Sequence, residues 1–135
     1  MNFDIEECSN IDNISEDEEY EYYRELLEFI KRNKKEIDTI KILTCFSNIM
    51  NAYYTGFHSQ QNPYKYFIES WILSHWNPYS IEETEYVTEI TIRLELENLY
   101  LKFKNLLRED LLSKNIQEEL SDTIVEAERE GYFNF

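Results

Sequence analysis

The sequence contains few residues of the kinds that interrupt regular secondary structure. Only two of its 135 residues are glycine and only two are proline. An all-β sandwich or barrel needs a turn signal about every 8–12 residues, so this composition argues against an all-β fold. Neither residue occurs between Pro78 and Gly131, which favours long helices in the second half of the chain.

Histidine and cysteine are equally scarce, with two of each. Two cysteines do not make a secreted disulfide framework, and Cys45 fits a helical apolar segment as a small core residue. His75 lies on an apolar stripe and is expected to be buried in the core, whereas His58 lies in a polar loop. No spacing typical of a zinc, calcium or di-iron site, a phosphate-binding loop or a serine nucleophile occurs. We therefore predict no catalytic, cofactor-binding or metal site.

Positive charge is the next deficit, with 13 Lys and Arg against 28 Asp and Glu and a net charge of −15. A general nucleic-acid binder needs excess Lys and Arg to contact phosphates, so that class is excluded. The first residues lack the basic and apolar regions of a signal peptide. The longest stretch without Asp, Glu, Lys or Arg, 42–64, is too polar to span a membrane. A cytoplasmic location is the resulting expectation.

Apolar residues make up 42% of the chain and aromatic residues 16%, which excludes a wholly disordered protein. The length predicts one domain, 1–135. Residues 1–14 are polar and acidic without a period, and we expect them to form a loosely ordered N-terminal arm. The capping box Ser15-x-x-Glu18 predicts the start of a first helix over 16–32. Apolar residues at helical spacing predict three further helices, over 35–54, 63–76 and 116–130.

The segment after Pro78 allows two interpretations. Alternating apolar residues over 89–96 are typical of a strand, which would make the fold α+β. The same residues fall on two opposite faces of a helix, and no glycine or proline interrupts it. We favour one long central helix over about 81–112. The predicted fold is therefore all-α, a single bundle of about five helices.

Acidic residues are concentrated in patches. Residues 1–23 contain nine acidic side chains and no basic one. Acidic residues at helix starts favour the helix dipole and solubility, which is one interpretation. The other is a surface that docks a basic protein, because complementary fields speed encounter and reject wrong partners. Tyrosines among these acids add rigid contact area typical of binding hot spots. The predicted partner-binding residues are Asp17, Glu18, Glu19, Tyr20, Glu21 and Tyr22, with Glu82, Glu83 and Glu85 as a second patch expected nearby.

A small, acidic chain without catalytic motifs is similar in size, charge and composition to immunity proteins that neutralise nuclease toxins in interbacterial competition. The expected function is therefore a non-enzymatic inhibitor of a basic bacterial toxin domain, without direct contact to nucleic acid or membrane. The first alternative is a phage-type DNA mimic that blocks a nuclease, which needs carboxylates in rows spaced like phosphates. A small enzyme is the remaining alternative. Charge reversal at Glu18, Glu19 and Glu21 is expected to weaken binding and leave stability nearly unchanged.

Overall fold

The computed structural model describes residues 3–34, 37–52 and 63–133. Helices account for 77% of the described residues, and no strand element occurs among them. The elements are a 3-10 helix η1 (Ile5–Asn10) and the helices α1 (Glu16–Arg32), α2 (Thr39–Ala52), α3 (Lys65–His75), α4 (Ile81–Leu94), α5 (Glu97–Glu109) and α6 (Lys114–Glu130). The all-α prediction is confirmed, and the described chain has six α-helices where about five were expected.

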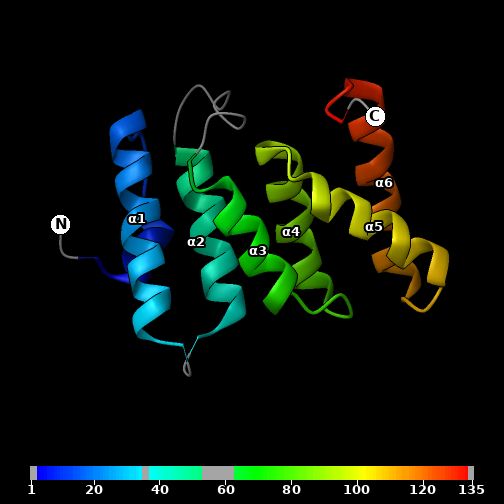
Figure 1. The fold of residues 1–135 in the computed structure, drawn as a ribbon, viewed down its shortest axis with the longest axis horizontal. Helices are drawn as coiled ribbons and strands as arrows, with labels where there is room; N and C mark the ends of the chain where they lie inside the picture. Colours follow the sequence, from blue (N-terminus) through cyan, green and yellow to red (C-terminus); the bar gives the residue numbers. More distant parts are fainter. Residues whose placement is uncertain (1–2, 35–36, 53–62, 134–135) are drawn as a thin grey trace.

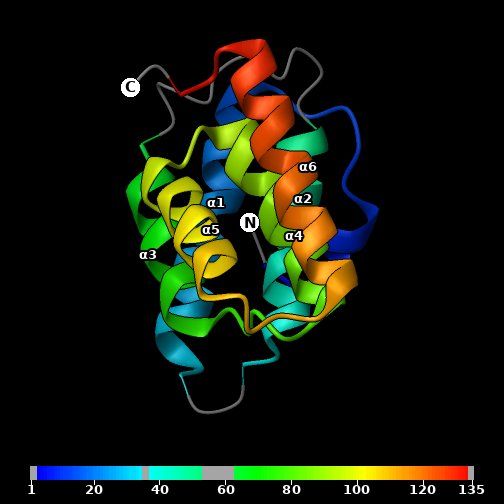
Figure 2. The same cartoon turned by 90° about the vertical axis from the view of Figure 1, so that its right-hand side faces the viewer.

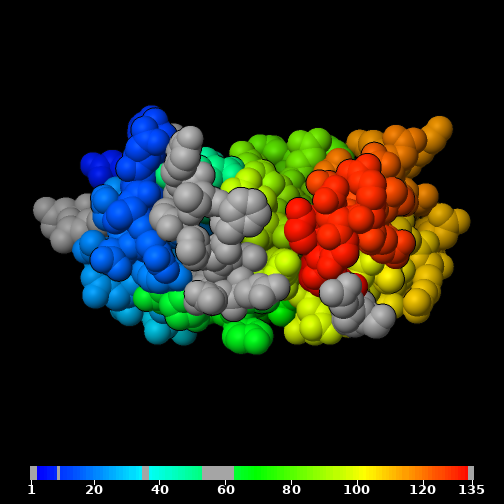
Figure 3. All heavy atoms as spheres, turned by 90° about the horizontal axis from the view of Figure 1, so that it is seen from above, coloured from blue at the N-terminus to red at the C-terminus, as the bar shows by residue number. Residues whose placement is uncertain are grey.

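The helices are arranged in a row with a second layer on one side (Figure 1). α1, α2, α4 and α6 follow one another along the long axis, and each packs against the next. α3 and α5 lie across one side of this row, in contact with each other and with α4 (Figure 2). α1 and α6 are therefore at opposite ends of the molecule, blue and red in Figure 3. One hydrophobic core connects the layers, from Leu26 of α1 through Phe46 of α2 to Leu120 of α6.

Residues 3–14, expected to be a loose arm, pack against the bundle. η1 lies on α2, and Cys8 within it is only 1% exposed. The ring of Phe3 contacts that of Phe29 with centroids 5.8 Å apart. The backbone N–H of Ile14 donates to the carbonyl of Ala52 at 3.1 Å. The few apolar residues of this segment therefore fix it to α1 and α2, despite its acidic composition.

The helix ends follow local capping signals where these are strong. Ser15 forms the predicted capping box with Glu18, and α1 covers the predicted range 16–32. α2 begins later than expected, because the Asp38 carboxylate accepts the N–H groups of Ile40 (3.0 Å) and Lys41 (3.4 Å). Of the predicted range 35–54, residues 35–36 and 53–54 lie outside the described residues. α6 ends where predicted, with Gly131 in the left-handed conformation at its C-cap.

The single long helix predicted over 81–112 is wrong, because the chain turns between α4 and α5. Glu95 adopts a left-handed backbone conformation with φ of 53°. The N–H of Leu96 donates to the carbonyl of Thr91 at 2.9 Å, which closes the end of α4. A left-handed non-glycine residue costs roughly 1–2 kcal/mol, so contacts elsewhere must offset it.

Those contacts come from the burial of Leu96, whose exposure is 0%, and from a carboxylate of α3. Glu69 accepts the backbone N–H groups of Asn98 (2.9 Å) and Leu99 (3.2 Å) and the side-chain amide of Asn98 (2.9 Å). It thereby caps α5 from another helix. The alternative strand over 89–96 is also wrong, since the residues up to Leu94 belong to α4. Their alternation reflects a helix buried on two faces.

His75 differs from its expected place in the core. It lies in the last turn of α3, and its side chain is exposed. Its ring stacks on Trp71, with centroids 4.4 Å and planes 13° apart, and its Nδ1 lies 2.8 Å from the carbonyl oxygen of Trp71. Trp71 itself is 5% exposed. His75 therefore lies on the exposed face of this end of α3, where its ring stacks on Trp71, while Ile72 and Trp76 beside it are buried. His58 lies outside the described residues.

Candidate functional site

The acidic start of α1 is largely occupied by local structure. The carboxylate of Glu18 accepts the backbone N–H of Ser15 at 3.2 Å, which completes the capping box. Glu16 accepts the hydroxyl of Tyr20 at 3.2 Å. Glu21 is half-buried and lies 3.7 Å from the guanidinium of Arg24. Asp17 and Glu18 are the exposed carboxylates among the predicted residues here, and of these two only Asp17 has a side chain without a hydrogen bond or ion pair to the described residues.

Glu19 is the exception among these acids because it is buried, with 5% of its surface exposed. Its Oε2 atom is enclosed and has no hydrogen-bond partner. Burial, and then the neighbouring charge of Glu16, raises the pKa of Glu19 from 4.5 to about 7. The Glu19 side chain therefore carries less than a full charge near neutral pH. Reversal of its charge would also place a lysine inside the protein, so the expectation that stability is nearly unchanged does not fit this position.

The two tyrosines of the predicted site are half-buried and contact the bundle. The ring of Tyr20 lies 6.5 Å from that of Tyr64 between centroids. Tyr22 packs against the hydrophobic core. The pKa of Tyr22 is raised mainly by burial and next by the nearby negative charges, of which Glu18 has the largest effect. These rings therefore contribute to the packing of α1 and offer a partner only part of their surface.

The second predicted patch lies at the start of α4, away from the first. Figure 1 shows that α1 starts at the top of the view and α4 at the bottom, with α2 between them. The structure therefore does not bring the two patches together. Glu82 is exposed, whereas Glu83 accepts the backbone N–H of Asn77 at 3.0 Å and so fixes the turn before α4. Glu85, one turn further along, faces a groove.

This groove runs between α4 and α6, which lie side by side in Figures 1 and 2, and its volume is about 260 Å³. Four carboxylates line it from both helices, together with two threonines, one isoleucine and a single cation. The lining residues are Glu85, Thr88, Glu89, Ile92, Arg93, Glu119, Thr123 and Glu126. Acidic side chains thus outnumber the basic one by four to one in a concave part of the surface.

Neutral donors hold two of these carboxylates in place. The hydroxyl of Thr88 donates to Glu119 at 2.8 Å across the two helices. The side-chain amide of Asn51 donates to Glu89 at 2.9 Å, and the hydroxyl of Ser47 donates to it at 3.4 Å. Hydroxyl and amide donors orient a carboxylate without removing its charge. Both groups are therefore hydrogen-bond acceptors with a defined position.

The remaining groups of the groove are not paired either. Among the described residues, Arg93 makes no ion pair, and the side-chain carboxylates of Glu85 and Glu126 make neither a hydrogen bond nor an ion pair. A lysine ammonium or arginine guanidinium entering the groove would meet carboxylates whose hydrogen-bonding capacity is unused. Charge-assisted hydrogen bonds of this kind are about twice as strong as neutral ones. The groove is therefore suited chemically to a basic side chain.

Sequence reasoning found Glu85 but missed Glu89, Glu119 and Glu126. Glu85 and Glu89 are spaced i,i+4, and Glu119 and Glu126 are spaced i,i+7, so each pair follows one face of its helix. That spacing was the available signal, but it does not reveal that the two faces meet. No group of three or more His, Cys, Asp or Glu in the described ranges is arranged to hold a metal ion.

Comparison with known proteins gives no match to a family model, to a curated protein or to a solved structure. Within the described ranges, every helix is too short or too polar to cross a membrane.

Proposed function

We propose that this chain is a non-enzymatic acidic inhibitor, an immunity protein that binds and neutralises a basic bacterial toxin domain such as a nuclease. The observation that carries this proposal is the α4–α6 groove, with four carboxylates and one arginine in its lining. The net charge of −15 extends the same field over the rest of the surface. A toxin that acts on nucleic acid carries Lys and Arg where it contacts phosphates, and those side chains are the ones that the groove accepts.

Two physical effects favour such a complex. The long-range field of an acidic protein raises the rate of encounter with a basic one and falls with added salt. At the groove, Glu89 and Glu119 are already oriented by Asn51 and Thr88, so little side-chain entropy is lost on binding. The exposed acids at the start of α1, Asp17 and Glu18, would act at longer range, as charges that steer the partner.

The shape of the acidic site supports an inhibitor of a protein more than a DNA mimic. A mimic needs a row of charges, since duplex DNA carries one per about 1.7 Å along its axis. The four carboxylates are instead gathered in one groove of about 260 Å³. The turn at Glu95 also divides the segment that would have formed one long charged helix.

The test begins with cross-linking in the native host and mass spectrometry to identify the bound partner. The purified toxin domain of that partner is then assayed with increasing amounts of this chain. We expect loss of toxin activity at an equimolar ratio. The double variant Glu85→Lys, Glu126→Lys should lose this inhibition while remaining folded by circular dichroism.

The matched control is the double variant Glu28→Lys, Glu109→Lys, which changes the net charge equally at exposed positions outside the groove. It should inhibit nearly as well as the wild type. Equal loss in both variants would mean that only net charge matters. A partner without basic character, or an undiminished toxin activity at every ratio, would contradict the proposed function.

A further inference from the structure

The two cysteines of this chain are far apart in sequence and adjacent in the fold. Cys8 belongs to η1 and Cys45 to α2, and they are 1% and 2% exposed. Both lie in the interface between η1 and α2, and Cys8 raises the pKa of the Cys45 thiol. No disulfide joins them. The sequence has no other cysteines. The one pair of side chains that could form a disulfide therefore lies in the interface between the N-terminal segment and α2.

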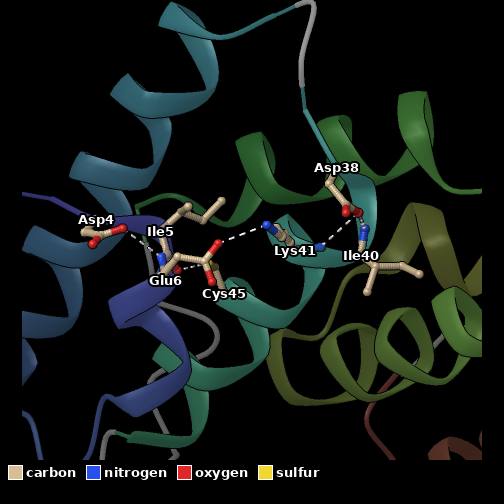
Figure 4. Close-up of polar contacts among 7 residues, drawn as sticks. All are labelled: Asp4, Ile5, Glu6, Asp38, Ile40, Lys41 and Cys45. Carbon is tan, nitrogen blue, oxygen red and sulfur yellow. Dashed lines mark hydrogen bonds and ion pairs between the residues drawn. The ribbon is translucent and has the colours of Figure 1, made fainter.

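The surrounding contacts hold the two elements in register. Cys45 Sγ lies 3.7 Å from the carbonyl oxygen of Ile5, and the side-chain amide of Asn48 donates to the carbonyl of Cys8 at 3.0 Å. At the surface, the ammonium group of Lys41 lies 2.9 Å from the carboxylate of Glu6 (Figure 4). These three contacts join η1 to successive turns of α2. They hold Cys8 and Cys45 in the same interface between η1 and α2.

We propose that Cys8 and Cys45 are a modification site at which a small disulfide compound oxidises the pair to an intramolecular disulfide. One thiol, as its thiolate, attacks a sulfur of the small disulfide and releases one small thiol. The second cysteine then attacks the mixed disulfide and releases the other small thiol. The Cys8–Cys45 bond forms as the bond of the reagent breaks, and the two hydrogens of the cysteines leave on the two released thiols.

The environment sets the order of events. The hydrogen bond with Cys8, and then burial, raise the pKa of the Cys45 thiol, so the closed structure holds little of the reactive thiolate. Reaction therefore requires η1 to lift from α2, and reclosure brings the second thiol to the mixed disulfide. The product fastens η1 to α2 covalently. This inference is independent of the proposed inhibitory function.

The test uses the reduced full-length chain incubated with oxidised glutathione, with mass spectrometry as the readout. We expect a monomer lighter by two hydrogen atoms, with both cysteines protected from N-ethylmaleimide. A peptide map should join the peptides that contain Cys8 and Cys45. The oxidised form should have a Tm higher by about 5–15 °C than the reduced form.

The control variants Cys8→Ser and Cys45→Ser each keep one thiol. Each should either remain reduced or gain a single glutathione, and neither should show the rise in Tm. The proposal is overturned if the wild type gains two glutathiones, forms disulfide-linked dimers, or keeps both thiols free while the urea-unfolded chain is oxidised. It is overturned equally if the linked monomer melts at a lower temperature than the reduced one.

Discussion

The start of α1 and the groove between α4 and α6 are both acidic, but their carboxylates are used differently. At α1, Glu18 completes a capping box, Glu21 pairs with Arg24, and Glu19 is buried. In the groove, Glu89 and Glu119 are held by neutral donors from α2 and α4. The density of acidic residues in the sequence therefore does not measure the charge available to a partner. What matters is whether a carboxylate is buried, as Glu19 is, or already paired with a cation, as Glu21 is.

Charge reversal should have its largest effect on binding in the groove. Glu85→Lys with Glu126→Lys should weaken binding of a basic partner by about 2–5 kcal/mol, because it removes one side of desolvated charge pairs. Asp17→Lys with Glu21→Lys at α1 should cost less than about 1 kcal/mol, as exposed pairs do. Isothermal titration calorimetry at low and high salt measures both. A larger loss of binding free energy in the α1 variant than in the groove variant would show that the partner binds at the start of α1.

Glu69 provides the opposite extreme, a carboxylate fully used by the structure. Glu69→Ala should lower the free energy of unfolding by about 2–4 kcal/mol, because it leaves the N–H groups of Asn98 and Leu99 without their acceptor. Urea unfolding followed by circular dichroism measures the change. Glu69→Gln keeps one acceptor and should recover part of the loss. Unchanged stability in the alanine variant would show that the turn at Glu95 does not depend on this cap.

Glu19 should make stability depend on pH. The pKa of Glu19 is about 7 in the folded chain, against an ordinary 4.5. Between pH 4.5 and 7 the folded chain therefore binds a proton at Glu19 more tightly than the unfolded chain does. Its contribution to stability is complete below pH 4.5 and is lost as the pH rises through 7. Glu19→Gln should therefore exceed the wild type in stability by about 1–2 kcal/mol at pH 8, after allowance for solvent screening.

Urea unfolding at pH 4.5 and at pH 8 tests this dependence. The advantage of Glu19→Gln should be present at pH 8 and nearly absent at pH 4.5. The exposed neighbour Asp17, changed to Asn, is the control and should show no comparable gain. The same advantage at both pH values would mean that packing, and not ionisation, separates glutamine from glutamate at this site.

The capping role of the α1 acids predicts the smallest effect. Ser15→Ala should cost about 1 kcal/mol, because it removes the hydroxyl that accepts the N–H of Glu18. Ser113 at the start of α6 makes no capping hydrogen bond through its side chain, so Ser113→Ala should cost much less. Thermal melts of the two variants make the comparison. Equal losses would mean that serine at either position acts through something other than capping.

The sequence predicted those parts of the fold that depend on neighbouring residues. The range of α1 followed from the Ser15–Glu18 box, and the end of α6 followed from Gly131. The turn at Glu95 was missed because its cap, Glu69, lies 29 residues away from Asn98. The groove was missed for the same reason, since Asn51 reaches Glu89 over 38 residues and Thr88 reaches Glu119 over 31. Such partners are set by packing and leave no local pattern.

The turn at Glu95 also has a consequence for how the chain folds. Locally, the segment from α4 to α5 favours a continuous helix, whereas the burial of Leu96 and the docked Glu69 of α3 favour the corner. We therefore expect the corner to gain stability when α3 docks, with a straight α4–α5 helix as the competing local arrangement. In stopped-flow refolding, Glu95→Gly should speed formation of the corner. If Glu95→Gly instead changes only the unfolding rate, the corner forms after the rate-limiting step of folding. In that case a straight α4–α5 helix does not slow folding.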